Sequence, residues 1–222
     1  YRSSAASDVY KRQIATSGEH LPKMRALLDV ESPVMPQLYT TMRGEKACAA
    51  SFEATSGQPL PRHLGKHTME PGQVIDAALS ILDGLKEAHR LGVLDNDLSP
   101  ESLRYTDSGE IRWLGAGLGW LLREEARCRG GSSALRVYNT PPGLTPSQHD
   151  LYSLGLCMYT MLTGATPTLI GADALVLPKI TQIPESLAQV INVATRGYFV
   201  SPSHMSITLR NLSDDTLGMT AS

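Results

Sequence analysis

Acidic side chains gather in one polar loop of the chain, DNDLSPES, which runs from Asp95 to Ser102. Carboxylate oxygens are the ligands that Mg²⁺ and Ca²⁺ prefer, and a carboxylate close to a hydroxyl can act as a general base. Asp95, Asp97 and Glu101 could therefore bind a cation, or Asp97 could take a proton from a substrate. The alternative is a solvated acidic loop whose carboxylates hydrogen-bond locally, and we favour that interpretation.

A glycine-rich run, GAGLG, begins at Gly115, thirteen residues after Ser102. Runs of this kind can cradle a phosphate with their backbone amides, but this one matches neither G-x-G-x-x-G nor the Walker pattern. It also follows no strand–helix–strand unit. We therefore expect no nucleotide binding through these glycines.

Helices with apolar faces are predicted on both sides of these loops. Helical spacing of apolar residues predicts a helix from about Pro71 to Gly92, with Thr68 as its cap. The segment from Asp150 to Thr163 is apolar nearly all round and stops at Gly164, as a buried central helix would. Two further helices are predicted over residues 184–195 and 204–212.

Short strands are predicted where turn residues separate apolar or β-branched runs. One hairpin is expected over residues 37–52, with a turn near Arg43-Gly44-Glu45, and a second over residues 103–114, with a turn at Asp107-Ser108-Gly109. Residues 53–62 are polar and contain Gly and Pro, so they are predicted to be a linker.

The composition excludes several classes of protein. The 222 residues carry a formal net charge of −2 with both signs interspersed, which argues against nucleic-acid or membrane-surface binding. No run reaches the roughly 18 apolar residues of a membrane span. The three cysteines, Cys48, Cys128 and Cys157, are widely spaced and indicate neither a disulfide framework nor a metal knuckle. A reduced, cytoplasmic setting is the expectation, either free or as the cytoplasmic part of a larger membrane-anchored protein.

In their order, these elements resemble the protein kinase fold over roughly residues 21–212. The resemblance implies an α+β fold, with a partial β-rich N-lobe and hinge over 14–58 and a mostly helical C-lobe over 59–213. Residues 214–222 are expected to be a tail. Residues 1–13, YRSSAASDVYKRQ, resemble a translated library adapter and are predicted to be a disordered tail.

The resemblance also assigns positions to the family's site residues. Phe52 stands at the gatekeeper position and Glu53 at the acidic hinge position, which together form a wall of the nucleotide pocket. Asp95-Asn96-Asp97 stands in place of His-Arg-Asp. The loop's Lys, its Asn and the first residue of Asp-Phe-Gly are replaced by Ser99, Ser102 and Gly115.

These replacements remove most of what phosphoryl transfer requires. In the family, the Asn and the Asp hold Mg²⁺ and the Lys steadies the transferred phosphate. Asp97 is the single catalytic candidate retained, at the base position. The family's Glu and Arg that form a buried ion pair correspond to Pro142 and Pro202, and losing both members together costs little. Asp150 is retained and is expected to hold the DNDL loop by hydrogen bonds.

The sequence therefore predicts a pseudokinase, a regulatory or scaffolding module that binds a protein partner. No cofactor is expected; ATP binding stays possible, and Mg²⁺ binding is doubtful. The first alternative is a weak or unconventional ATP-dependent Ser/Thr protein kinase. The second is a diverged small-molecule phosphotransferase, against which the loss of both metal ligands argues.

Overall fold

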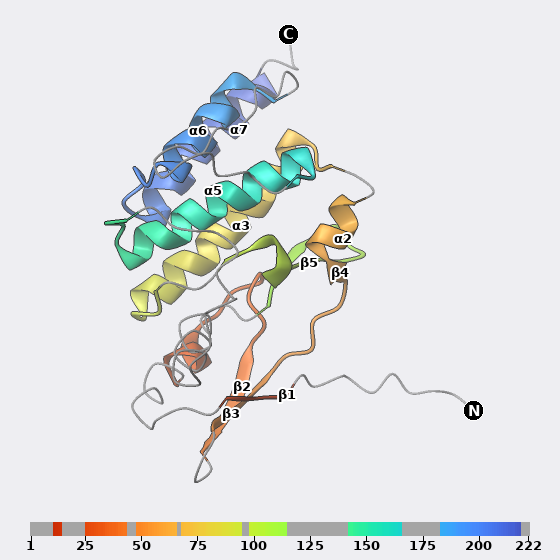
Figure 1. The fold of residues 1–222 in the computed structure, drawn as a ribbon, viewed down its shortest axis with the longest axis vertical. Helices are drawn as coiled ribbons and strands as arrows, with labels where there is room; N and C mark the ends of the chain where they lie inside the picture. The colour runs from red at the N-terminus through yellow and green to blue at the C-terminus, as the bar shows by residue number, and fades with distance from the viewer. Residues whose placement is uncertain are drawn as a thin grey trace, which may run out of the picture.

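The computed structural model describes residues 11–14, 25–43, 48–65, 68–94, 98–114, 142–165 and 183–218. Figure 1 shows helices α3, α5, α6 and α7 gathered at one end of the molecule and the sheet of β1, β2 and β3 at the other. A second small sheet and helix α2 lie between these two parts. This is the α+β arrangement predicted from the sequence, with few strands and mostly helices.

The first sheet has the strand order β1-β3-β2, with both pairings antiparallel. Strands β2 (Leu38–Arg43) and β3 (Cys48–Phe52) confirm the first predicted hairpin. Strand β1 (Lys11–Ile14) pairs with the outer edge of β3, so the prediction of a disordered tail is wrong for residues 11–13. The unpaired amides and carbonyls of a strand edge can bond to almost any extended segment, which explains the pairing despite the polar sequence.

The second sheet has the order β4-β5-β6 and contains the second predicted hairpin, β5 (Leu103–Tyr105) with β6 (Ile111–Trp113). Strand β4 (Gln58–Pro59) and helix α2 (Leu60–Leu64) lie within the predicted linker, which is therefore wrong in part. Both elements are too short for a sequence pattern to reveal. They are held by pairing with β5 and by burial of Leu60 and Leu64.

Helix α3 (Pro71–Arg90) buries the predicted apolar face. Its cap is Glu70, which forms a capping box with Gln73, and not Thr68. Gly84, in the middle of α3, lets the segment 32–35 pack directly on the helix, because a Cβ there would lie 2.8 Å from Val34 Cγ1. This close approach fixes where the segment leading into β2 sits on the helical part of the molecule.

Helix α5 (Pro146–Thr163) starts one turn earlier than predicted, at a capping box between Thr145 and Gln148, and it ends at Gly164 in the left-handed conformation. Helix α6 (Glu185–Thr195) confirms the prediction. Helix α7 (Pro202–Gly218) extends past the predicted start of the C-terminal tail, so the tail boundary at residue 214 is wrong.

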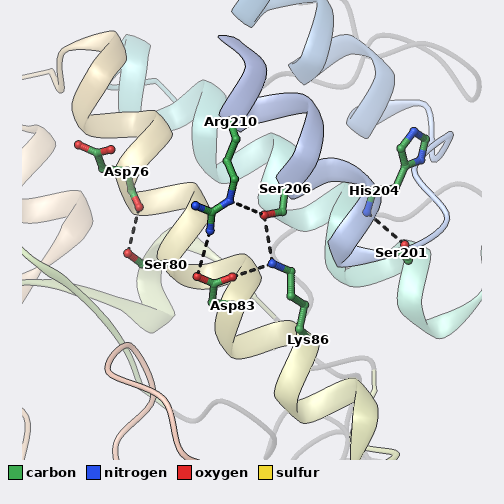
Figure 2. A network of polar contacts seen from close by, with 8 residues as sticks. All are labelled: Asp76, Ser80, Asp83, Lys86, Ser201, His204, Ser206 and Arg210. Atoms are coloured by element: carbon green, nitrogen blue, oxygen red, sulfur yellow. Dashed lines mark hydrogen bonds and ion pairs between the residues drawn. The ribbon is translucent and has the colours of Figure 1, made fainter. Parts of the chain in front are cut away.

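Helices α3 and α7 lie side by side and share a polar network on their outer surface (Figure 2). Lys86 Nζ lies 2.7 Å from Asp83 Oδ1 and donates to Ser206 Oγ at 3.1 Å. Arg210 reaches both Ser206 Oγ and Asp83 Oδ2 from α7. Exposed ion pairs of this kind contribute at most about 1 kcal/mol each, so the apolar core between the helices carries most of the packing energy.

One continuous apolar core joins the segment 27–38 to helices α3, α5, α6 and α7. No helix within the described ranges is both long and apolar enough to cross a membrane.

Candidate functional site

The loop expected to carry catalysis is described from Leu98 onward, so Asp95 and Asp97 lie outside the described residues. Ser99 is buried and caps the short helix η3 (Pro100–Ser102). The two serines bond to each other's backbone: Ser99 N donates to Ser102 Oγ at 3.0 Å, and Ser102 N donates to Ser99 Oγ at 3.3 Å. Ser102 Oγ also donates to Ser99 O at 2.7 Å. Both hydroxyls are therefore engaged within a single turn.

These contacts do not fit a magnesium–nucleotide site. The Ser102 hydroxyl uses its hydrogen and one lone pair inside the turn, and a neutral hydroxyl is a weaker Mg²⁺ ligand than a carboxylate. Ser99 supplies no positive charge toward a phosphate. Among the described residues, no group of three or more His, Cys, Asp or Glu side chains could hold a metal ion.

Gly115, expected at the second metal-ligand position, also lies outside the described residues. The residue before it, Leu114, is placed by a backbone bond from its N–H to Ser102 O at 2.7 Å. The end of β6 and the loop after Ser99 therefore lie together, as a kinase-like arrangement requires.

Asp150 is almost completely buried in α5 and pairs with His89 at the end of α3. His89 Nε2 lies 2.8 Å from Asp150 Oδ2, and because a carboxylate only accepts, Nε2 must donate. Nδ1 lies 3.2 Å from Ser147 Oγ on the first turn of α5. The three side chains join α3 to α5 in the core. The predicted bonds from Asp150 to the loop at residues 95–97 lie outside the described residues.

Glu53, expected at the hinge position, is held by a partner that the sequence did not predict. Arg112 on β6 donates from Nη2 to Glu53 Oε2 at 2.7 Å and from Nη1 to Pro33 O at 2.8 Å. The same carboxylate oxygen accepts from Gln37 N at 3.2 Å, while Glu53 N donates to Gln37 O. Phe52, just before Glu53, is partly buried against the core.

A second arginine, Arg104 on β5, reaches the same hinge segment. Its Nη1 donates to Gly57 O at 3.0 Å. Gly57 has a φ of +95°, and a Cβ there would lie 2.4 Å from Tyr105 O, so the hinge runs directly against β5. Alternation along two three-residue strands would have placed both arginines on the face opposite Leu103 and Trp113, and that was the signal available in the sequence.

Pro142 and Pro202 were expected at the positions of the family's buried ion pair. Pro142 is exposed, whereas Pro202 is buried at the first turn of α7. The first turn of α5 packs on the turn between α6 and α7: Gln148 Nε2 donates to Gly197 O at 2.8 Å. A Cβ at Gly197 would lie 2.3 Å from Leu144 Cδ2, so this packing requires glycine.

Comparisons with known proteins give bacterial and eukaryotic protein kinases, although no protein-family model matches the chain. The serine/threonine-protein kinase PknL of Mycobacterium tuberculosis is 32% identical over 108 residues, which is 45% of this chain and 26% of PknL. The serine/threonine-protein kinase pkn2 of Myxococcus xanthus is 28% identical over 156 residues, 64% of this chain and 19% of that protein. Mitogen-activated protein kinase 14 of Xenopus laevis is 32% identical over 136 residues, 56% of this chain and 37% of that protein.

The crystal structure of the PknI kinase domain of Mycobacterium tuberculosis covers 87% of this chain and 76% of its own length, with a TM-score of 0.64 and 15% sequence identity. At that identity the likeness establishes the fold alone. The chain spans about a quarter of the length of PknL and a fifth of pkn2.

Proposed function

Because the chain has a protein kinase-like fold, we propose that it acts as a pseudokinase domain, a regulatory or scaffolding module that binds another protein and has no efficient phosphoryl transfer. The observation that carries this proposal is the paired turn of Ser99 and Ser102. The positions expected to hold a cation for the phosphate and a ligand for Mg²⁺ are occupied by serines that bond to each other.

Phosphoryl transfer requires little covalent chemistry from the protein. Catalysis depends on positioning and on neutralising the phosphate charge, and positioning alone can lower a barrier by about 7–11 kcal/mol. A retained base at Asp97 would act on a substrate hydroxyl with no phosphate held opposite it. Asp97 therefore stays a predicted general base, but we predict no measurable rate of phosphoryl transfer from it.

A weak or unconventional ATP-dependent Ser/Thr protein kinase is the second candidate. The names of the relatives favour it, since PknL and pkn2 are both serine/threonine-protein kinases. It requires that ATP bind with little or no help from the metal-ligand positions. Retention of Asp97 is compatible with either candidate.

Thermal unfolding of the full chain with ATP, with and without Mg²⁺, separates the two candidates. A ligand at about 100 times its Kd adds about 2.7 kcal/mol to the free energy of unfolding, which a thermal scan resolves. We expect no shift under either condition. A shift with ATP, whether or not Mg²⁺ is present, contradicts the expectation and favours the kinase, and an Asp97→Ala variant that then loses transferase activity would establish the base.

A protein partner is the proposed ligand, and nucleic acid and the membrane surface are not. The net charge of −2 gives the chain no excess of positive charge for phosphate backbones or anionic lipids. We place the domain in the cytoplasm, free or as part of a larger membrane-anchored protein.

A further inference from the structure

We propose that Arg104 and Arg112 form a built-in interlobe link, which holds the hinge against the C-lobe without a nucleotide. The inference rests on the proposed function, because it explains how a domain that binds no ATP can keep its two lobes in one arrangement. It assigns a role to two residues that neither the sequence pattern nor the family resemblance marked.

The first half of the link is the fork of Arg112. Its two terminal nitrogens donate to different segments of the N-lobe and hinge, Pro33 O at 2.8 Å and Glu53 Oε2 at 2.7 Å. Planar guanidinium groups suit such paired contacts, and a single lysine nitrogen could not reach both in the same way. The Arg112 side chain is 20% exposed and the Glu53 side chain is 39% exposed, so solvent reaches the carboxylate side of this ion pair and partly screens it.

Glu53 extends the connection to Gln37, the residue before β2. Its Oε2 accepts from Gln37 N at 3.2 Å as well as from Arg112, and its own N–H donates to Gln37 O at 2.8 Å. A neighbouring backbone bond, from Trp113 N to Val34 O at 2.7 Å, ties β6 to the same N-lobe segment. One strand of the C-lobe sheet thus holds the segment 33–37 and the hinge together.

The second half of the link is Arg104, which lies directly opposite Arg112 in the antiparallel register of β5 and β6. Like charges in opposite positions are unfavourable, so the pair needs separate acceptors. Arg112 has Glu53, and Arg104 donates to Gly57 O at the other end of the hinge segment. Two neighbouring arginines therefore hold residues 53–57 at both ends.

This arrangement changes what the hinge offers to a ligand. Small-molecule sites are usually apolar slots with a few unsatisfied polar groups aimed at the ligand. Here two charged guanidinium groups reach the hinge, and they already engage the Glu53 carboxylate and the Gly57 carbonyl. The adenine base of a nucleotide that stacked against this segment would have to displace one of these arginines or strip water from it. A protein partner would meet the same lobe arrangement whether or not ATP is present.

Hydrogen exchange of backbone amides in the full chain tests the link. In the absence of nucleotide, we expect Arg112→Met to raise the exchange rates of the Gln37 and Glu53 amides about tenfold or more, because a hydrogen bond to a charged group is worth at least that factor. Arg104→Met should speed exchange of the amides of Gly57 and Gln58. Arg196→Met makes the same change at an exposed position at the end of α6 and should alter neither region.

Two further measurements separate loss of the link from loss of folding, and separate failure of this proposal from failure of the proposed function. Amides of α5 should exchange at wild-type rates in every variant, and Arg112→Lys, which keeps the charge but not the fork, should fall between the wild type and Arg112→Met. Unchanged exchange at Gln37 and Glu53 in Arg112→Met overturns the link and leaves the pseudokinase proposal standing. Hinge protection that appears in the wild type only with ATP overturns both.

Discussion

The junction of α3 and α5 and the turn at Ser99 and Ser102 both keep polar side chains away from water, but with different kinds of partner. At the junction, a buried carboxylate, Asp150, is paired with His89 from another helix. In the turn, the hydroxyls of Ser99 and Ser102 each bond to the backbone of the other residue, within four residues of chain. The side chains of one region are paired over a long range, and the side chains of the other are paired within the turn.

The difference teaches which parts of a kinase-like fold can lose their chemistry without losing their structure. A buried charge without a partner costs several kcal/mol, so Asp150 cannot be replaced alone. A lysine or asparagine in the loop can become serine at little cost, since serine is a favourable capping residue. The expected catalytic positions in this loop can therefore change at little cost, whereas Asp150, which pairs with His89 between the helices, cannot change alone.

Removing the carboxylate at the helix junction should have the largest effect. Asp150→Ala leaves the His89 Nε2–H buried without its acceptor, and we expect the free energy of unfolding to fall by about 3–5 kcal/mol. Urea unfolding measures the change. Asp76→Ala, at an exposed position of α3, is the control and should stay within about 0.5 kcal/mol of the wild type. Equal midpoints for Asp150→Ala and the wild type would refute the structural role of this pair.

Two glycines of α3 test how the N-lobe segment is seated on the helical part. Gly84→Ala places a Cβ 2.8 Å from Val34 Cγ1 and should destabilise the chain by about 1–2 kcal/mol, although alanine is the better helix former. Gly72→Ala meets no atom within 4 Å and should stabilise it by up to about 1 kcal/mol. We predict that the two substitutions change stability in opposite directions, and thermal denaturation of both variants checks this. A stabilised Gly84→Ala would mean that the segment 32–35 is not packed on α3 as described.

Features set by local sequence were predictable, and those set by distant partners were not. The turn Asp107-Ser108-Gly109 and the apolar run of α5 predicted a hairpin and a buried helix that the structure confirms. The assignment of Ser99 and Ser102 to the family's Lys and Asn positions came from the resemblance to the kinase family. The acceptors of Arg112 are 59 and 79 residues away, and that of Arg104 is 47 residues away. No local pattern specifies such pairs.

Short or edge elements were missed for a related reason. Strand β4 and helix α2 have no period long enough to detect, and tertiary contacts hold them. The pairing of β1 with β3 contradicted a prediction made from polar composition, because backbone bonding at a strand edge is nearly independent of side chains. Helix starts were misplaced by two to four residues: the cap of α3 is Glu70 and not Thr68, and α5 starts at Pro146 and not at Asp150.

Opening the serine turn should have a moderate effect on stability and none on chemistry. Ser102→Ala removes the hydroxyl that bonds to both Ser99 N and Ser99 O, and we expect a loss of about 1 kcal/mol by urea unfolding. Ser203→Ala, at an exposed position in the first turn of α7, is the matched control. Ser102→Asn should produce no Mg²⁺-dependent thermal shift with ATP, because the other ligand position is Gly115. Such a shift would show that one residue separates this domain from an active site.

The smallest expected effect concerns Cys157, which lies fully buried in α5. Burial raises the pKa of its thiol well above the ordinary value, and the nearby charge of Glu101 raises it further. The folded state therefore keeps a proton that the unfolded state releases, so stability must fall as pH rises through the unfolded thiol's pKa. With an unfolded pKa of about 8.5, the free energy of unfolding should fall by about 0.7 kcal/mol between about pH 8 and pH 9. Urea unfolding of Cys157→Ala should lack this component of the slope, and an identical slope in the two proteins would place the thiol in water.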